Sequence, residues 1–204
     1  MTTSAQDVWM PILLRLSAVL VQSEDFRDDL TPEARSSGWC GLPPASEEEV
    51  LEVEMRLGLT LPPSYRSFLS VSNGWRPFDN LIERLMTVLE IGYYREIDPE
   101  DVAMTQKYFQ ENDISDIDYL DYDNPAHCEA LRHRYYPTSV LIGKGWGVES
   151  ERILLNPSIV SIGGEWEVIY FANWIPGNRR YRSFRHFMEG EIKQLENFKA
   201  SGPK

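Results

Sequence analysis

Cysteines, basic residues and long apolar runs are all scarce in this chain of 204 residues. The two cysteines, Cys40 and Cys128, lie too far apart in sequence and are too few to form a disulfide framework. No run of about 18 apolar residues occurs, so we expect no membrane span. The N-terminal residues lack the pattern of a secretory signal, which predicts a cytoplasmic location with reduced thiols.

Positive charge is the other shortage. Twenty Lys and Arg residues stand against 32 Asp and Glu, for a formal net charge of −12. Binding to nucleic acid or to an anionic membrane depends on basic residues that neutralise phosphates. The composition therefore argues against both kinds of partner. It fits a protein that meets a basic protein partner.

Motifs that carry catalytic chemistry are missing too. His127, Cys128 and His133 match no common spacing of zinc ligands. The glycine-rich segment GKGWG at residues 143–147 lacks the spacing of a phosphate-binding loop, so we interpret it as the connection between two strands. No G-x-S-x-G nucleophile elbow occurs. The sequence therefore predicts a protein that is not an enzyme and that holds no cofactor or metal.

What the sequence does contain is a well-punctuated stretch from Ser46 to Trp75, SEEEVLEVEMRLGLTLPPSYRSFLSVSNGW. Ser46 and Glu49 have the spacing of a capping box at the start of a helix, and Gly58 provides its left-handed C-cap. A pair of prolines opens a second helix in its first turn, where proline is tolerated, and an Asn-Gly pair ends it. Because the break between the helices is so short, they must meet at an angle.

The remainder predicts an α+β fold. We expect an apolar helix over residues 5–22, a polar connector up to residue 45, and a C-terminal helix capped by Ser183. The first helix is interpreted as a packing element, with partner docking as the alternative. Segments with helical character are 88–94, 99–112 and 128–135, segment 81–87 is either a strand or a helical turn, and apolar runs typical of strands are 139–143, 151–155, 159–162 and 166–172. We predict an antiparallel-rich, mixed sheet of about four to six strands with helices packed around it, an N-terminal two-helix corner and a C-terminal helix.

Negative charge is concentrated in the middle of the chain. Between Glu96 and Glu129 there are eleven acidic residues, and Lys107 is the only Lys or Arg. The spacing of the aspartates does not fit a calcium-binding EF-hand loop. One interpretation is a solvated acidic surface. The other is a docking surface for a basic protein, in which carboxylates steer the partner and aromatic rings supply contact area. The candidate partner-binding residues are Asp116, Asp118, Tyr119, Asp121, Tyr122 and Asp123. We expect the basic cluster Arg179, Arg180, Arg182 and Arg185 to pair with acidic residues of this region; the alternative is that it binds an anion at the start of the last helix.

The stretch Ser46–Trp75 resembles the entry motif of the SUKH superfamily. The matching residues are Glu49, Glu54, Leu57, Gly58, Leu61, Pro62, Tyr65, Phe68, Leu69, Asn73 and Gly74, with the aromatic Trp75 after them. The segment EWEVIYFANW and the following SFRHFM, which holds Phe184 and Phe187, are similar to the closing strands and helix of that family. The likeness indicates a single domain over residues 39–200, preceded by an N-terminal helix and connector over residues 1–38.

The resemblance implies a function as well as a fold. Many bacterial members of the superfamily are immunity proteins that neutralise toxins, and a fungal member regulates cell-wall synthesis and signalling. It implies a non-enzymatic binding protein, here an immunity protein that blocks a cognate toxin domain with a basic surface, such as a nuclease. The alternative is a regulatory or scaffolding domain that has no toxin partner.

Overall fold

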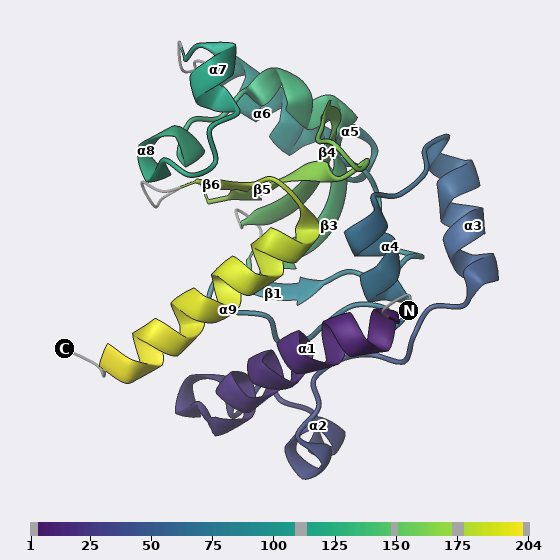
Figure 1. Cartoon of the computed structure of the whole chain (residues 1–204), viewed down its shortest axis with the longest axis vertical. Helices are drawn as coiled ribbons and strands as arrows, with labels where there is room; N and C mark the ends of the chain where they lie inside the picture. The colour runs from purple at the N-terminus through teal and green to yellow at the C-terminus, as the bar shows by residue number, and fades with distance from the viewer. Residues whose placement is uncertain (1–3, 109–113, 148–150, 173–177, 202–204) are drawn as a thin grey trace.

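A computed structural model of the chain describes residues 4–108, 114–147, 151–172 and 178–201, and the described part forms an α+β structure around one antiparallel sheet (Figure 1). Its strands are β1 (Ile82–Leu85), β2 (Gly92–Tyr93), β3 (Val140–Gly145), β4 (Arg152–Val160), β5 (Trp166–Phe171) and β6 (Arg179–Tyr181). Their order is β1-β3-β4-β5-β6, and β2 pairs with β3 beside β1. The predicted fold class is confirmed.

Helices cover the sheet on two sides (Figure 1). One side carries α1 (Ala5–Gln22), α4 (Pro63–Leu69) and α9 (Phe184–Ser201). The other side carries α5 (Tyr94–Ile97), α6 (Pro99–Tyr108), α7 (Asp116–Tyr119), α8 (Pro125–Cys128) and the 3-10 helix η2 (His133–Thr138). At the periphery lie the 3-10 helix η1 (Glu24–Phe26), α2 (Pro32–Ser37) and α3 (Glu47–Leu57). We refer to the two sides as the α9 face and the α7 face.

The α9 face is built on packed aromatic rings. Phe68 of α4 lies between Trp9 of α1 and Phe184 of α9, with ring centroids 5.6 and 5.0 Å away. The ring of Tyr65 packs against Phe184 at 4.8 Å. All four side chains are buried. The two stretches that carry the family resemblance, far apart in sequence, therefore meet in this cluster, and α1 joins them in the same core.

The corner between α3 and α4 forms, and α3 begins and ends as its punctuation predicts, but α4 ends at Leu69, before the predicted stop at Asn73-Gly74. Ser46 and Glu49 make both hydrogen bonds of a capping box, and Gly58 ends α3 with a φ of 65°. Glu54 accepts hydrogen bonds from the backbone N–H of Leu61 and from Arg66, at 2.9 and 3.2 Å. Asn73 accepts from the N–H of Val88 at 2.9 Å. The polar motif residues thus satisfy backbone groups at the corner, and they have a structural role.

Several predicted boundaries are wrong. Residues 88–94 do not form a helix, because Gly92 and Tyr93 pair with β3 as β2. Residues 159–162 are not a separate strand, because β4 continues through Asn156-Pro157 by way of a register shift, where proline is tolerated. Residues 128–135 do not form one helix, because α8 ends at Cys128 and η2 begins at His133. Helix α2 within the connector and strand β6 were not predicted. Helix 99–112 is confirmed as α6 up to Tyr108, and residues 109–112 and Asp113 lie outside the described residues.

Within the described residues, no helix has the length and apolar character needed to cross a membrane.

Candidate functional site

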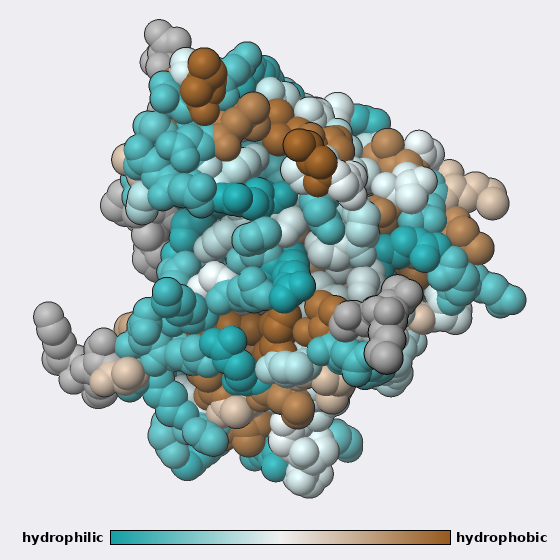
Figure 2. Space-filling view, viewed as in Figure 1, coloured by the Kyte–Doolittle hydropathy of each residue, from teal (hydrophilic) through white to brown (hydrophobic). Residues whose placement is uncertain are grey.

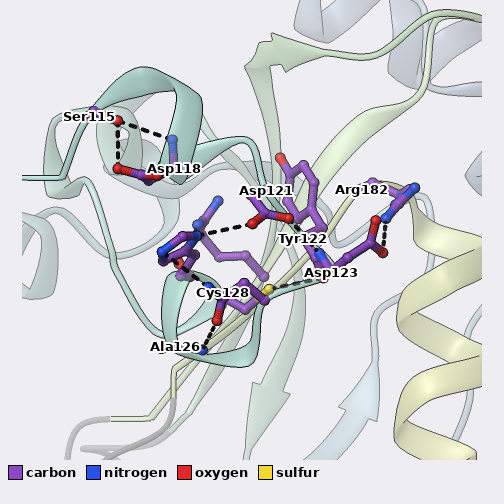
Figure 3. A network of polar contacts seen from close by, with 11 residues as sticks. Ser115, Asp118, Asp121, Tyr122, Asp123, Ala126, Cys128 and Arg182 are labelled. Carbon is purple, nitrogen blue, oxygen red and sulfur yellow. Dashed lines mark hydrogen bonds and ion pairs between the residues drawn. The ribbon is translucent and has the colours of Figure 1, made fainter.

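The acidic segment, Ser115–Glu129, contains two helices of only four residues each. Ser115 caps α7 by accepting the N–H of Asp118 at 3.1 Å, and Asn124 caps α8 by accepting the N–H of Ala126 at 3.1 Å (Figure 3). Helices this short are not stable by themselves. The segment must therefore be held in place by tertiary contacts.

A buried ion pair beneath the acidic segment provides these tertiary contacts. The Nη1 atom of Arg180 in β6 lies 2.7 Å from Oε1 of Glu167 in β5, and both side chains are fully buried. The guanidinium of Arg180 also donates hydrogen bonds to the backbone carbonyls of Ala130 and His127, at 2.7 and 2.6 Å. Glu167 accepts hydrogen bonds from Tyr122 at 2.9 Å and from Asn156 of β4 at 2.9 Å. Because a buried pair is stable only when its remaining donors and acceptors are satisfied, the Arg180–Glu167 pair and the segment above it depend on each other.

Tyr119 completes this support from α7. Its hydroxyl donates to Glu167 at 3.2 Å, and its ring centroid lies 3.6 Å from the guanidinium of Arg180 and 4.1 Å from that of Arg132. The residue is fully buried, and burial raises the pKa of its hydroxyl well above the usual range. The prediction that Tyr119 supplies contact area for a partner is therefore wrong, because the ring lies under the surface, between cations.

Tyr122 is half-buried, and burial also raises the pKa of its hydroxyl, which is bonded to Glu167. Figure 3 shows it beside the carboxylates of the segment. The four aspartates remain at the surface: the side chains of Asp116 and Asp123 are 83% and 85% exposed, Asp118 is exposed, and Asp121 is partly exposed. All four predicted carboxylates are therefore accessible at the surface.

Basic side chains nearby contact three of these aspartates. Asp116 binds Arg132 at 2.7 Å, Asp121 contacts His127 Nδ1 at 3.2 Å, and Asp123 binds Arg182 (Figure 3). The expected pairing of the basic cluster with acidic residues of this region is thus confirmed for Arg182, whereas Arg180 pairs with Glu167 of β5 and contacts the region only through backbone carbonyls. It is wrong for the other two members, which bind acids of α9 instead: Arg179 pairs with Glu191 and Arg185 with Glu189.

Sequence reasoning missed Glu167 and Asn156 as supports of the site. Glu167 stands in a strand whose six residues are all buried. A carboxylate in such a strand needs a cationic partner, because an unpaired buried charge is very costly. The sequence signal for this buried ion pair was therefore a single Glu in an otherwise apolar strand, followed by the arginines of residues 179–185.

The residues considered for metal or nucleophile chemistry make ordinary protein contacts. His127 contacts Asn124 as well as Asp121, the Cys128 thiol donates to the carbonyl of Tyr122 at 3.3 Å, and His133 packs against Tyr136. Burial raises the pKa of the Cys128 thiol, which makes it a weaker nucleophile. Both cysteines are free, and among the described residues no group of three or more His, Cys, Asp or Glu side chains is placed to hold a metal ion.

A groove separates the acidic segment from the turn between β4 and β5. This groove, which we name the α7–hairpin groove, has a volume of about 610 Å³ and is lined from both sides by aliphatic and acidic residues. Figure 2 shows hydrophobic residues interspersed among hydrophilic ones where α7 and this turn lie. The site is thus a surface with charge and apolar contact area, which is suited to binding a protein.

Comparison with known proteins bears on this arrangement. The model of the SMI1 / KNR4 family (SUKH-1) matches residues 44–190, which is well over half of the chain. The match includes the corner, the sheet, the acidic segment and the first turns of α9. No curated protein matches the sequence. The extent of the family match confirms the resemblance seen in the corner and the closing strands, and the chain belongs to the SMI1/KNR4 (SUKH-1) family.

Proposed function

We propose that this protein is an immunity protein, which neutralises a bacterial toxin in the cytoplasm by binding it in equimolar amounts, without catalysis or a cofactor. The observation that carries the proposal is the acidic segment: four aspartates at the surface, fixed to the sheet by the buried Arg180–Glu167 pair. Membership of the SMI1/KNR4 (SUKH-1) family is consistent with a protein that acts by binding other proteins.

The charge of this surface defines the partner's chemistry. Residues 114–131 include five acids and neither Lys nor Arg. A toxin that acts on nucleic acid must present a basic surface to its substrate, and an acidic inhibitor competes for that surface. Complementary charge also accelerates association. The fixed support matters here because a surface that is already ordered loses less conformational entropy on binding.

The first experiment is a titration. The partner is sought in the gene neighbourhood: a toxin domain encoded there is purified, and its activity is measured as this protein is added. We expect complete inhibition at a 1:1 ratio. Undiminished toxin activity at equimolar protein contradicts the proposal, and inhibition at far lower ratios indicates an enzyme that inactivates the toxin. A chain that binds other proteins but inhibits no toxin fits the regulatory or scaffolding role instead.

A set of charge variants then tests the surface. Replacing Asp116, Asp118, Asp121 and Asp123 by asparagine should slow association with the toxin about tenfold or more at low salt and flatten its salt dependence. The matched control replaces four exposed acids elsewhere with amides: Asp28, Asp29, Glu33 and Glu52. Equal association rates for the two variants would show that the acidic segment is not the docking face.

A further inference from the structure

The α7–hairpin groove has two unlike walls. One wall is the acidic segment, which contributes Leu120, Asp121 and Asp123. The other is the end of the β4–β5 hairpin, which contributes Val160, Ile162 and Glu165 among others. The turn itself is closed by hydrogen bonds from the N–H of Ser161 to the carbonyl of Glu165 and from the N–H of Gly164 to the carbonyl of Ser161, at 2.8 and 3.0 Å. Both walls are therefore ordered in the free protein.

Aliphatic side chains are unusually exposed along this groove. Ile162 is fully exposed, Val160 is 55% exposed and Leu120 is 50% exposed. Ile117, one turn before Leu120 on α7, is 85% exposed and extends the apolar surface beyond the groove. Single exposed aliphatic residues are common, but several gathered at one place mark an interaction site. The fold gives no structural reason to place isoleucine at the tip of a hairpin.

Carboxylates stand on both walls of the groove. Asp123 is neutralised by Arg182, which also lines the groove. Asp121 accepts a hydrogen bond from the N–H of Asp123 and contacts the partly buried ring of His127, both at 3.2 Å, and Glu165 accepts hydrogen bonds from the backbone and hydroxyl of Ser64 at 2.9 and 2.6 Å. Within the part of the chain that the structure describes, Glu165 pairs with no basic side chain. A carboxylate has about four acceptor positions, so both groups can bind a further donor.

We infer that the α7–hairpin groove takes an arginine side chain from an apolar segment of the protein partner, with the guanidinium between Asp121 and Glu165 and the flanking apolar residues on Ile162, Val160 and Leu120. This inference rests on the proposed function, since it names the part of the basic toxin that docks. An arginine has the required form, because its aliphatic stem packs on apolar surface while its planar head binds carboxylates. A wholly apolar occupant would leave two carboxylates desolvated without partners, and an acidic one would be repelled.

A peptide titration followed by amide NMR tests the groove directly. The probe is a short synthetic peptide in which arginines alternate with leucines, and the matched control carries citrulline, the neutral isostere, in place of each arginine. We expect chemical-shift changes confined to residues 120–123 and 159–165, with binding about tenfold weaker for the citrulline peptide. Shift changes centred elsewhere, or equal affinity for the two peptides, would overturn the inference.

Two variants separate the apolar and the charged parts of the groove. Ile162→Ser and Asp121→Asn should each weaken binding of the arginine peptide about tenfold, with no change in melting temperature, because both side chains are at the surface. The controls are Leu89→Ser and Glu52→Gln, which remove an exposed aliphatic residue and an exposed acid outside the groove. A loss of affinity in the controls equal to that in the groove variants would contradict the assignment.

The same variants distinguish failure of this inference from failure of the proposed function. If Ile162→Ser and Asp121→Asn still inhibit the toxin with unchanged affinity, the immunity function stands and the groove is not the docking point. If the peptide binds in the groove but the protein inhibits no toxin, the groove stands and the partner is another basic protein.

Discussion

The two faces of the sheet are held together by different forces, and neighbouring arginines of β6 illustrate the contrast. Successive residues of a strand point to opposite faces, so Arg179 and Arg180 lie on opposite sides. On the α9 face, Arg179 binds Glu191 at the edge of a large apolar core. On the α7 face, Arg180 and Glu167 form a buried pair, and the acidic segment is attached to them by hydrogen bonds and by the ring of Tyr119.

The helices on the two faces reflect this difference. Helix α9 has 18 residues and buries four large apolar side chains: Phe184, Phe187, Met188 and Ile192. Helix α7 has four residues and buries only Tyr119, and all residues of α8 are at least partly exposed. The α9 face thus gains its stability from apolar burial, which depends little on detailed geometry. The acidic segment on the α7 face depends on the polar network around Arg180 and Glu167, which fixes the position of the surface carboxylates.

The largest effect is expected on the α9 face. Replacing Phe68 by alanine leaves a cavity among Trp9, Tyr65 and Phe184 and should lower the free energy of unfolding by about 3–5 kcal/mol. Urea denaturation measures this loss in the free energy of unfolding. The control is Met55→Ala, because the side chain of Met55 in α3 is exposed and its removal should cost less than about 0.5 kcal/mol. If the comparison of the faces is right, the folded variant binds its partner with unchanged affinity. If the folded Phe68→Ala protein bound its partner more weakly than the wild type does, the two faces would be energetically coupled.

A smaller and more local effect is expected on the α7 face. Tyr122→Phe removes one hydrogen bond to the buried carboxylate of Glu167 and should cost about 1–3 kcal/mol. Hydrogen exchange should show faster exchange at the amides of Ser115–Ala130 than in α9. The matched control is Tyr93→Phe, which removes a hydroxyl bonded to the neutral carbonyl of Leu57 at 2.8 Å and should cost about 1 kcal/mol. A uniform increase in exchange along the chain would mean that the network holds the whole fold and not the segment.

The same difference explains what the sequence predicted well. Helix 5–22, the corner from Ser46 to Trp75 and the helix after Ser183 all have apolar residues at helical spacing and recognisable caps. The two short helices of the acidic segment have caps, but with four residues each they are too short to show helical spacing. The segment packs on Arg180 and Glu167, which are charged residue types that usually lie at the surface.

The candidate site was predicted in part for the same reason. The exposed aspartates are visible in the sequence as an excess of charge, and in the structure all four are at least partly exposed. Tyr119 was assigned to that surface wrongly, because nothing in its local sequence shows that two guanidinium groups from other elements enclose its ring. The groove was not predicted, since its walls come from segments about 40 residues apart that only the sheet brings together.

The most gradual expected effect is a dependence of stability on pH that arises on the α9 face. Burial raises the pKa of Glu191 to about 7 from 4.5, against the opposing effects of Arg179 and of its hydrogen bond from Tyr181, and nearby Asp79 adds to the rise. A carboxyl group whose pKa is higher in the folded state stabilises the fold below its unfolded pKa, and this contribution is lost as the pH rises through the folded pKa.

The free energy of unfolding should therefore fall between about pH 4.5 and pH 7 by up to about 1.4 kcal/mol per pH unit relative to Glu191→Gln, which cannot titrate. Urea denaturation of both proteins across this range measures the difference, and Glu52→Gln serves as the control for loss of a surface charge. Parallel profiles for the wild type and Glu191→Gln would show that the buried carboxylate remains ionised beside Arg179. The two arginines of β6 would then hold their glutamates in the same way, and the contrast between the faces would rest on apolar burial alone.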